Sequence, residues 1–137
     1  MEGTYQHNID AKGRLFVPAS LREELGDSFH VTISPEPCLE MYPKAEWDAF
    51  RLKISELPRL KQRKFRKFFA HAAACTLDTQ GRILLPQQLR EFAGLGKNVM
   101  VVGDGGRAQL WDSAKWAEVD AAETTQDALN DAFEELG

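Results

Sequence analysis

Residues 9–26 read IDAKGRLFVPASLREELG, and residues 77–94 read LDTQGRILLPQQLREFAG. Eight of these eighteen aligned pairs are identical, whereas average residue usage gives roughly one identity by chance. The chain therefore contains a tandem duplication. A unit that recurs in this way often cannot bury its apolar face alone, so we expect the two copies to complete one another.

The composition is that of a globular protein whose charge is unevenly distributed. A chain of 137 residues suffices for one ordinary domain or two half-size modules. The net charge is -4, but residues 1–117 carry 17 basic and 14 acidic side chains. Seven acidic and no basic side chains follow. The body is thus mildly basic, and the acidity belongs to the C-terminal tail.

Several classes of protein are disfavoured by the sequence. The apolar runs are too short for a transmembrane helix or a secretory segment, so we expect a cytoplasmic protein. Cys38 and Cys75 occupy non-equivalent positions in different repeats, which favours two buried thiols over a disulfide. The three histidines are scattered, and no nucleophile–base pair occurs. We therefore predict no metal, cofactor or catalytic residue, and no enzyme.

Turn residues and apolar alternation predict the order β-β-α-β-β in each repeat, an α+β fold made mainly of strands. Pro18 suits the first position of a helix and Gly26 the position after one, which predicts a short helix over 19–25. The strands are expected at 4–9, 14–17, 30–33 and 39–42 in the first repeat, and near 75–77, 82–85, 99–102 and 109–111 in the second. The first two strands of each repeat are expected to form a hairpin.

Four short strands and one small helix cannot enclose a core, and they leave open strand edges. Interleaving the two hairpins into one small swapped-hairpin barrel would remove both problems. We therefore divide the chain into repeat 1 (residues 5–47), a helical linker (48–75), repeat 2 (76–119) and an acidic tail (120–137).

Apolar spacing predicts two helices in the linker. The first carries Trp47, Phe50 and Ile54 and runs to about residue 56, before Pro58. The second has an apolar face and a basic opposite surface. Its apolar face comprises Phe65, Phe68, Phe69 and Ala72, and the basic residues are Arg59, Lys61, Arg63, Lys64, Arg66 and Lys67. We interpret the basic surface as a subunit interface or a solvated face rather than a DNA contact.

The C-terminal region is predicted to be helical. Asp112 can cap the helix that carries Trp116. Leu129, Phe133 and Leu136 form a weak apolar stripe beyond it, typical of either a frayed helix or a segment that docks on a partner.

The repeated motif Asp-x-x-Gly-Arg contains the candidate functional residues. Gly13 and Gly81 permit a positive φ, so the chain can reverse and bring Asp10 opposite Arg14, and likewise Asp78 opposite Arg82. A guanidinium oriented by a carboxylate presents a planar fork to phosphate or to guanine. The alternative is that each Asp-Arg pair only ties its hairpin together, and the chemistry alone leaves both interpretations open.

Four further residues near the motif have secondary roles in this interpretation. Lys12 and Gln80 precede the two glycines, where one could neutralise a phosphate and the other could contact base edges. Arg22 and Arg90 lie in the short helices, and we expect them to be solvated residues paired with neighbouring glutamates.

The motif, with the apolar residues and proline that follow it, resembles the signature of the SpoVT-AbrB family of swapped-hairpin DNA-binding domains. The doubled arrangement with a helical insert is similar to the MraZ family of bacterial transcriptional regulators, over residues 4 to about 119. This resemblance implies a cytoplasmic, nucleoid-associated ring, an octamer or dodecamer, that binds double-stranded DNA. It also implies that the DNA sites are short direct repeats upstream of the protein's own operon of division and cell-wall genes.

The resemblance favours DNA binding by the motif arginines over a purely structural role of the Asp-Arg pairs. A second hypothesis is an antitoxin-like protein-interaction module, in which the barrel dimerises and the acidic tail binds a basic protein. The tail of about twenty residues is short for that function.

Overall fold

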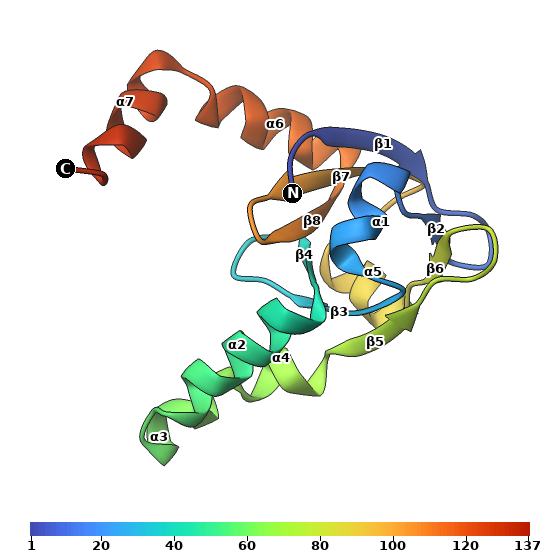
Figure 1. The fold of residues 1–137 in the computed structure, drawn as a ribbon. Helices are drawn as coiled ribbons and strands as arrows, with labels where there is room; N and C mark the ends of the chain where they lie inside the picture. Colours follow the sequence, from blue (N-terminus) through green and yellow to red (C-terminus); the bar gives the residue numbers. More distant parts are fainter.

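A body of strands carries two separate helical arms in the computed structural model, which describes residues 1–137 (Figure 1). The strands are β1 (Thr4–Asn8), β2 (Arg14–Phe16), β3 (Ser28–Ile33), β4 (Leu39–Tyr42), β5 (Ala73–Thr76), β6 (Arg82–Leu84), β7 (Asn98–Asp104) and β8 (Arg107–Asp112). The helices of the body are α1 (Ala19–Leu25) and α5 (Gln87–Phe92). The predicted order β-β-α-β-β is confirmed in both repeats.

The strands of the two repeats are interleaved in both sheets. Six of them form an antiparallel sheet in the order β1-β7-β8-β4-β3-β5, and β2 pairs with β6 in a second, two-stranded sheet. The first strand of each repeat pairs with the third strand of the other, as β1 with β7 and β5 with β3. The α+β class and the interleaving of the hairpins are thus confirmed, with the strands divided between two sheets.

The local hairpin is smaller than expected. Residues 4–9 and 14–17 meet only at a single bridge between Ile9 and Leu15. Beyond this bridge the two strands separate, because each finds its hydrogen-bonding partner in the other repeat. The expectation that the first two strands of each repeat pair with one another is therefore wrong outside the turn.

Both repeats contribute to one main hydrophobic core. Leu15 and Leu21 of the first repeat and their equivalents Ile83 and Leu89 of the second are at most 2% exposed. Cys75 belongs to the same core, and Cys38 to a smaller cluster with Val102 and Trp111. Both cysteines are buried free thiols, as predicted.

The linker forms the insert arm, which consists of α2 (Lys44–Ser55), α3 (Arg59–Gln62), the 3-10 turn η1 (Arg63–Phe65) and α4 (Arg66–Ala70). The second linker helix is therefore interrupted, and it ends before Ala72. Aromatic contacts rather than one continuous helix hold this segment: the ring centroids of Phe50 lie 6.3 Å from Phe65 and 5.7 Å from Phe69. Trp47 packs against Phe69 at 5.8 Å.

The C-terminal arm consists of α6 (Ser113–Glu123) and α7 (Gln126–Glu134). Asp112 stands at the position before α6, but its side chain makes no capping hydrogen bond there. Its Oδ1 atom instead accepts a hydrogen bond from Gly96 N at 3.0 Å, so the predicted cap is wrong. Thr125 caps α7 by accepting from Ala128 N at 3.2 Å. None of the helices combines the length and the apolar character needed to cross a membrane.

Candidate nucleic-acid interface

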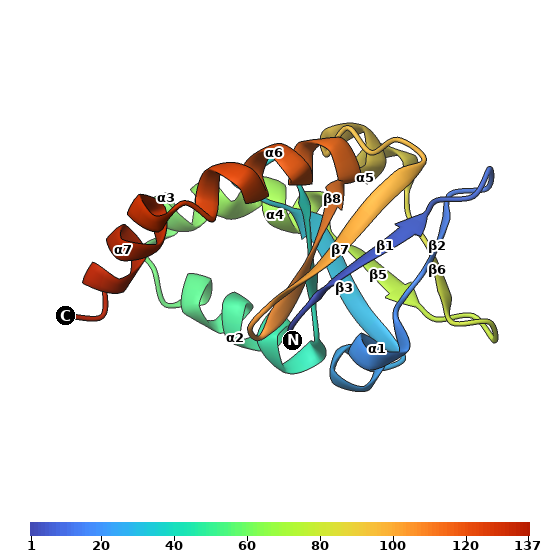
Figure 2. The ribbon, with the colours of Figure 1, turned by 90° about the horizontal axis from the view of Figure 1, so that it is seen from above.

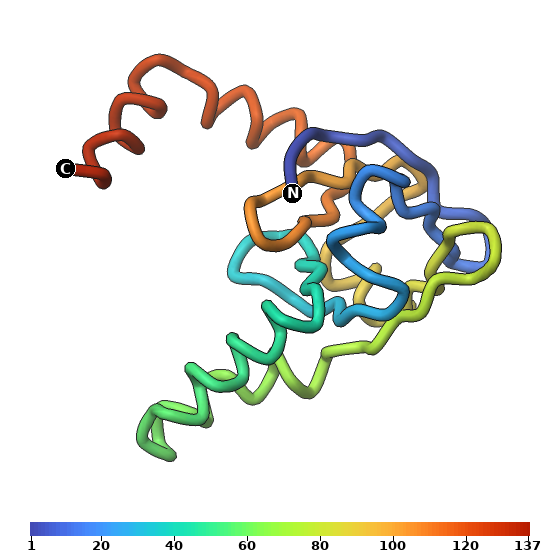
Figure 3. Tube along the Cα trace, in the orientation of Figure 1, coloured from blue at the N-terminus to red at the C-terminus, as the bar shows by residue number.

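Two loops with the same sequence motif project from the end of the body opposite the arms, and their outermost residues point away from one another in Figure 2 (Figures 2 and 3). They are residues 10–14 and 78–82, which we call loop tips 1 and 2. The pairing of β2 with β6 brings the bases of the two loops together, because Arg14 lies opposite Leu84 and Phe16 opposite Arg82 in the register. The duplicated motif is thus gathered into one surface.

The Asp10 carboxylate organises loop tip 1. Its Oδ1 atom accepts hydrogen bonds from the backbone N–H groups of Lys12 at 3.0 Å and Arg14 at 2.9 Å. Its Oδ2 atom accepts from Arg14 Nε at 2.7 Å. The turn closes with Gly13 N donating to Asp10 O at 3.0 Å, and Gly13 adopts φ +82°. Asp10 therefore faces Arg14 across the turn, as predicted.

Loop tip 2 repeats this arrangement. Asp78 Oδ1 accepts from the backbone N–H groups of Gln80 and Arg82, both at 2.9 Å, and Oδ2 accepts from Arg82 Nε at 2.9 Å. Gly81 adopts φ +77°. The duplication thus preserves the geometry as well as the sequence, and the structure presents two equivalent Asp-Arg pairs.

The two guanidinium groups remain accessible. The Arg14 side chain is 32% exposed and that of Arg82 is 26% exposed. Within the protein both form hydrogen bonds through Nε, which leaves the terminal nitrogens available as donors. Because the fixed side chain loses little freedom when it binds, such a guanidinium is suited to an external anion or base edge.

The electrostatics of the loop tips keep both acids ionised. Hydrogen bonds from the backbone N–H of Arg14 and from the Arg14 side chain lower the pKa of Asp10, against an opposing effect of desolvation. The pKa of Asp78 is lowered in the same way, first by the backbone N–H of Arg82. Each carboxylate is thus held as an acceptor for its arginine.

The other residues predicted near the loop tips fall into two groups. Lys12 and Gln80 are exposed at the tips, with side chains that form no hydrogen bond within the protein. Arg22 and Arg90 do not form the expected ion pairs with neighbouring glutamates. Each instead crosses to the loop tip of the other repeat.

The contacts of these two arginines correct the sequence-based expectation. The Arg22 guanidinium lies 4.9 Å from the ring centroid of Phe16, and a Cβ atom at Gly81 would lie 2.6 Å from Arg22 Nη1. Arg90 Nε donates to Leu85 O at 3.2 Å, and a Cβ atom at Gly13 would lie 3.1 Å from Arg90 Nη2. The interleaving of the repeats produces the contacts with Gly81 and Gly13, so no local helical spacing could have revealed them.

The remaining candidates do not form a second site of this kind. The linker aromatics and Trp116 pack against other aromatic rings, as expected for core and interface residues. No group of three or more His, Cys, Asp or Glu side chains is placed to hold a metal ion. The basic residues of the insert arm lie at the end of the molecule away from the loop tips (Figure 2).

A comparison with known protein families matches the chain over almost its whole length. The family model of MraZ proteins, described as antitoxin-like, matches residues 1–66 and again 68–135. The match therefore includes two copies of the family unit, in agreement with the duplication.

Curated relatives carry the same family name. The "Transcriptional regulator MraZ" of Carboxydothermus hydrogenoformans is 50% identical over 117 residues, which cover 83% of this chain and 82% of the relative. That of Heliobacterium modesticaldum is 47% identical over 119 residues, covering 85% and 83%. That of Halothermothrix orenii is 42% identical over 139 residues, covering 98% and 97%.

Proposed function

The chain belongs to the MraZ family, and we propose that it is a transcriptional regulator that binds double-stranded DNA through its two loop tips. The observation that carries this proposal is the pair of equivalent, partly exposed guanidinium groups at one end of the body. Arg14 and Arg82 contact phosphate or base edges in this account. Asp10 and Asp78 orient them, and Gly13 and Gly81 allow the turns that make this possible.

Lys12 and Gln80 extend the same surface. Both are exposed beside the arginines, so Lys12 adds a charge for a phosphate and Gln80 adds an amide that can contact a base edge. The Arg22 guanidinium packs against Gly81 of loop tip 2, and the Arg90 guanidinium packs against Gly13 of loop tip 1. A rigid support of this kind keeps the donors in place for the duplex.

The regulator acts as a homo-oligomeric ring of eight or twelve subunits in this proposal. The loop tips of one subunit form a small surface, and a single short DNA box would therefore be held weakly. The proposed DNA sites are tandem direct repeats upstream of the protein's own division and cell-wall genes. Neighbouring subunits of one ring would bind these repeats simultaneously, which gives a large gain in avidity. Because the proposed DNA sites are genomic, the protein is cytoplasmic and associated with the nucleoid in this proposal.

Different segments of the chain serve DNA binding and assembly in this proposal. Residues 4–42 and 73–112 present the loop tips as one interleaved body, whereas residues 44–70 and 113–134 form the arms on the other side. The arms are thus free for contacts between subunits while the tips contact DNA. The body needs no catalytic residue or cofactor for this function.

The first experiment isolates genomic DNA fragments that the purified full-length protein retains, and then measures its affinity for one recovered duplex at rising salt concentration. We expect the logarithm of the binding constant to fall linearly with the logarithm of the salt concentration, because phosphate contacts release counterions. Affinity that does not change with salt would contradict phosphate binding by the loop tips.

A second candidate function is suggested by the antitoxin-like description of the family model. In that case a basic partner protein would bind the acidic tail, which has seven carboxylates and no basic residue after Lys115. A partner protein that copurifies in equal amount with the chain, together with no retained DNA, would favour this alternative.

A further inference from the structure

The tail helix α7 has an apolar face that nothing in the subunit covers. Leu129, Phe133 and Leu136 are 41%, 70% and 81% exposed. Their spacing places them along one side of the helix and the turn that follows it. At about 100° per residue, Glu134 and Glu135 lie about 130° from the centre of this stripe, one on each side, towards the back of the helix. The tail helix therefore combines an uncovered apolar stripe with an acidic opposite face.

The tip of the insert arm has the complementary character. Residues 59–67 contain six basic and no acidic side chains, and exposed Leu60 lies among them with 74% of its surface accessible. None of the six forms an ion pair within the subunit: Arg59, Lys61, Arg63, Lys64, Arg66 and Lys67. A concentration of like charge around an apolar side chain favours an acidic, partly apolar partner.

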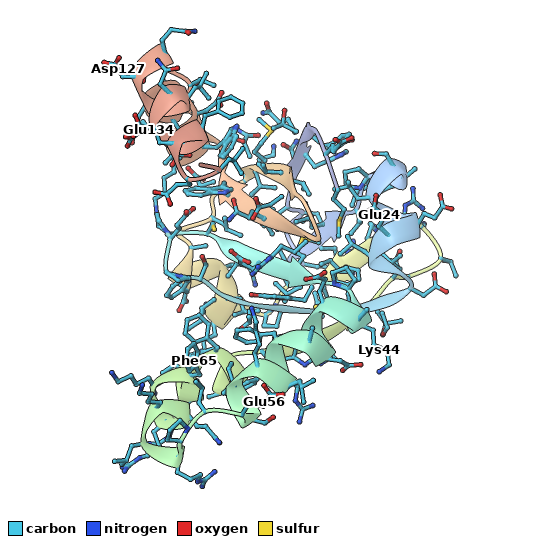
Figure 4. The ribbon with its side chains drawn as sticks, turned by 60° about the vertical axis from the view of Figure 1, so that its left-hand side comes forward. Glu24, Lys44, Glu56, Phe65, Asp127 and Glu134 are labelled. Carbon is cyan, nitrogen blue, oxygen red and sulfur yellow. The ribbon has the colours of Figure 1, made fainter.

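The two surfaces do not meet within one subunit. The insert arm and the C-terminal arm leave the body in different directions, with Phe65 on one and Asp127 and Glu134 on the other (Figure 4). The loop tips lie at the opposite end of the body (Figure 2), so a duplex bound there leaves the basic tip of the insert arm uncovered. A second copy of the chain supplies the complementary surface.

We propose that the tail helix of one subunit docks on the tip of the insert arm of a neighbouring subunit. The stripe of Leu129 and Phe133 covers Leu60, and the acidic side chains on the rest of the helix, Glu134 and Glu135 among them, attract the basic side chains that surround Leu60. The contact joins unlike surfaces, and head-to-tail contacts of this type close into rings. The inference rests on the proposed assembly and identifies the contact that forms it.

Cross-linking between copies tests the geometry directly. Full-length Leu60→Cys and Phe133→Cys proteins are mixed and treated with a short bismaleimide, with wild type as the control for the buried Cys38 and Cys75. We expect a linked dimer that contains one chain of each variant, at a yield well above that of either variant alone. A mixture that links no better than the separate variants, or efficient linking of Phe133→Cys to itself, would overturn the proposal.

Charge reversal tests the chemistry of the contact. We expect Lys61→Glu/Lys64→Glu, and separately Glu134→Lys/Glu135→Lys, to raise the concentration needed for assembly about tenfold or more. Mixing the two reversed proteins should restore assembly, as measured by light scattering after size exclusion. Lys53→Glu on α2 and Glu123→Lys on α6 are matched controls outside the contact, and circular dichroism checks the fold.

Binding to a duplex with a single box separates this inference from the proposed function. Reversed variants that lose assembly but keep single-box affinity support the contact. Unchanged assembly in both variants, with single-box binding intact, overturns the contact and leaves the DNA-binding function standing. Loss of single-box affinity in Lys61→Glu/Lys64→Glu at unchanged assembly would also overturn it, because the insert arm would then bind DNA.

Discussion

Asp10 in the first repeat lies 4.0 Å from Arg82 Nη1 in the second repeat. The same Oδ2 atom accepts the hydrogen bond from Arg14 Nε at 2.7 Å. One carboxylate thus stands between the two candidate DNA-binding guanidinium groups, which come from opposite halves of the chain. Their separation is set by the β2–β6 pairing rather than by a flexible linker, so the two groups meet a duplex as one preformed unit.

The loop-tip carboxylates predict a pH dependence of stability. The pKa values of Asp10 and Asp78 are lowered in the fold, chiefly by the backbone N–H groups of Arg14 and Arg82. Their contribution is therefore fully present above the ordinary Asp pKa of about 4 and is lost as the pH falls through the lowered values. We expect Asp10→Asn/Asp78→Asn to lower the Tm at pH 7, with the difference from wild type shrinking towards pH 3.

Thermal unfolding followed by circular dichroism between pH 7 and pH 3 measures this difference. Asp127→Asn/Asp131→Asn, on the exposed tail helix, is the control and should follow wild type. A Tm difference that stays constant over the whole range would show that the two carboxylates do not stabilise the loop tips.

The contact between Arg22 and Gly81 predicts a coupled effect of substitution. Gly81→Ala introduces a Cβ atom 2.6 Å from Arg22 Nη1 at φ +77°, whereas Gly105→Ala meets nothing within 4 Å at φ +69°. Gly105→Ala therefore measures the cost of the backbone conformation alone, about 1–2 kcal/mol. We expect Gly81→Ala to cost more, and the excess to disappear in an Arg22→Ala background.

Urea unfolding of the four proteins of this double-mutant cycle gives the coupling free energy. If Gly81→Ala costs the same with and without the Arg22 side chain, the packing of α1 on the opposite loop tip does not contribute to stability.

The two thiols are predicted to be unreactive in the folded protein. Burial raises the pKa of Cys38 to about 12 and that of Cys75 to about 11, so almost no thiolate is present at pH 8. We expect a maleimide reagent to label neither residue in the native state and both in urea, as counted by mass spectrometry. Rapid labelling of the native protein would contradict the placement of either cysteine in the core.

Multivalent binding predicts that the affinity depends on the number of DNA boxes. We expect the affinity of the assembled protein to rise by orders of magnitude from one to two boxes in tandem, and further with three. The tail variant Glu134→Lys/Glu135→Lys should lose most of this gain while keeping its affinity for one box. Affinity that is independent of box number, measured by fluorescence anisotropy, would remove the argument for multivalent binding.

The duplicated motif made much of the site predictable. Gly13 and Gly81 mark turns because a positive φ is cheap only for glycine, and the spacing from Asp10 to Arg14 is short enough for a local hydrogen bond. The need of each repeat for a partner followed from its size. These features are local or compositional, and they are readable from one sequence.

The features that sequence reasoning missed depend on contacts between distant residues. The crossing of Arg22 to Gly81 and the use of Asp112 by Gly96 rather than by α6 arise only when the repeats interleave. The first two strands of each repeat, which were predicted to pair with one another, pair instead with strands of the other repeat. A local propensity describes what a segment does alone, and these segments are held by residues far away in the chain.

The proposed function depends above all on the presentation of the Arg14 and Arg82 guanidinium groups to DNA. Its most direct test is the affinity of Arg14→Ala/Arg82→Ala for a single-box duplex, compared with Arg51→Ala/Lys53→Ala, which removes the same charge from α2 at the far end of the molecule. We expect a loss of about 100-fold or more for the first protein, little change for the second, and native circular dichroism and assembly size for both. Unchanged affinity of a folded Arg14→Ala/Arg82→Ala protein would contradict the account, and so would unfolding of that protein, since the pairs would then serve only to tie the hairpins.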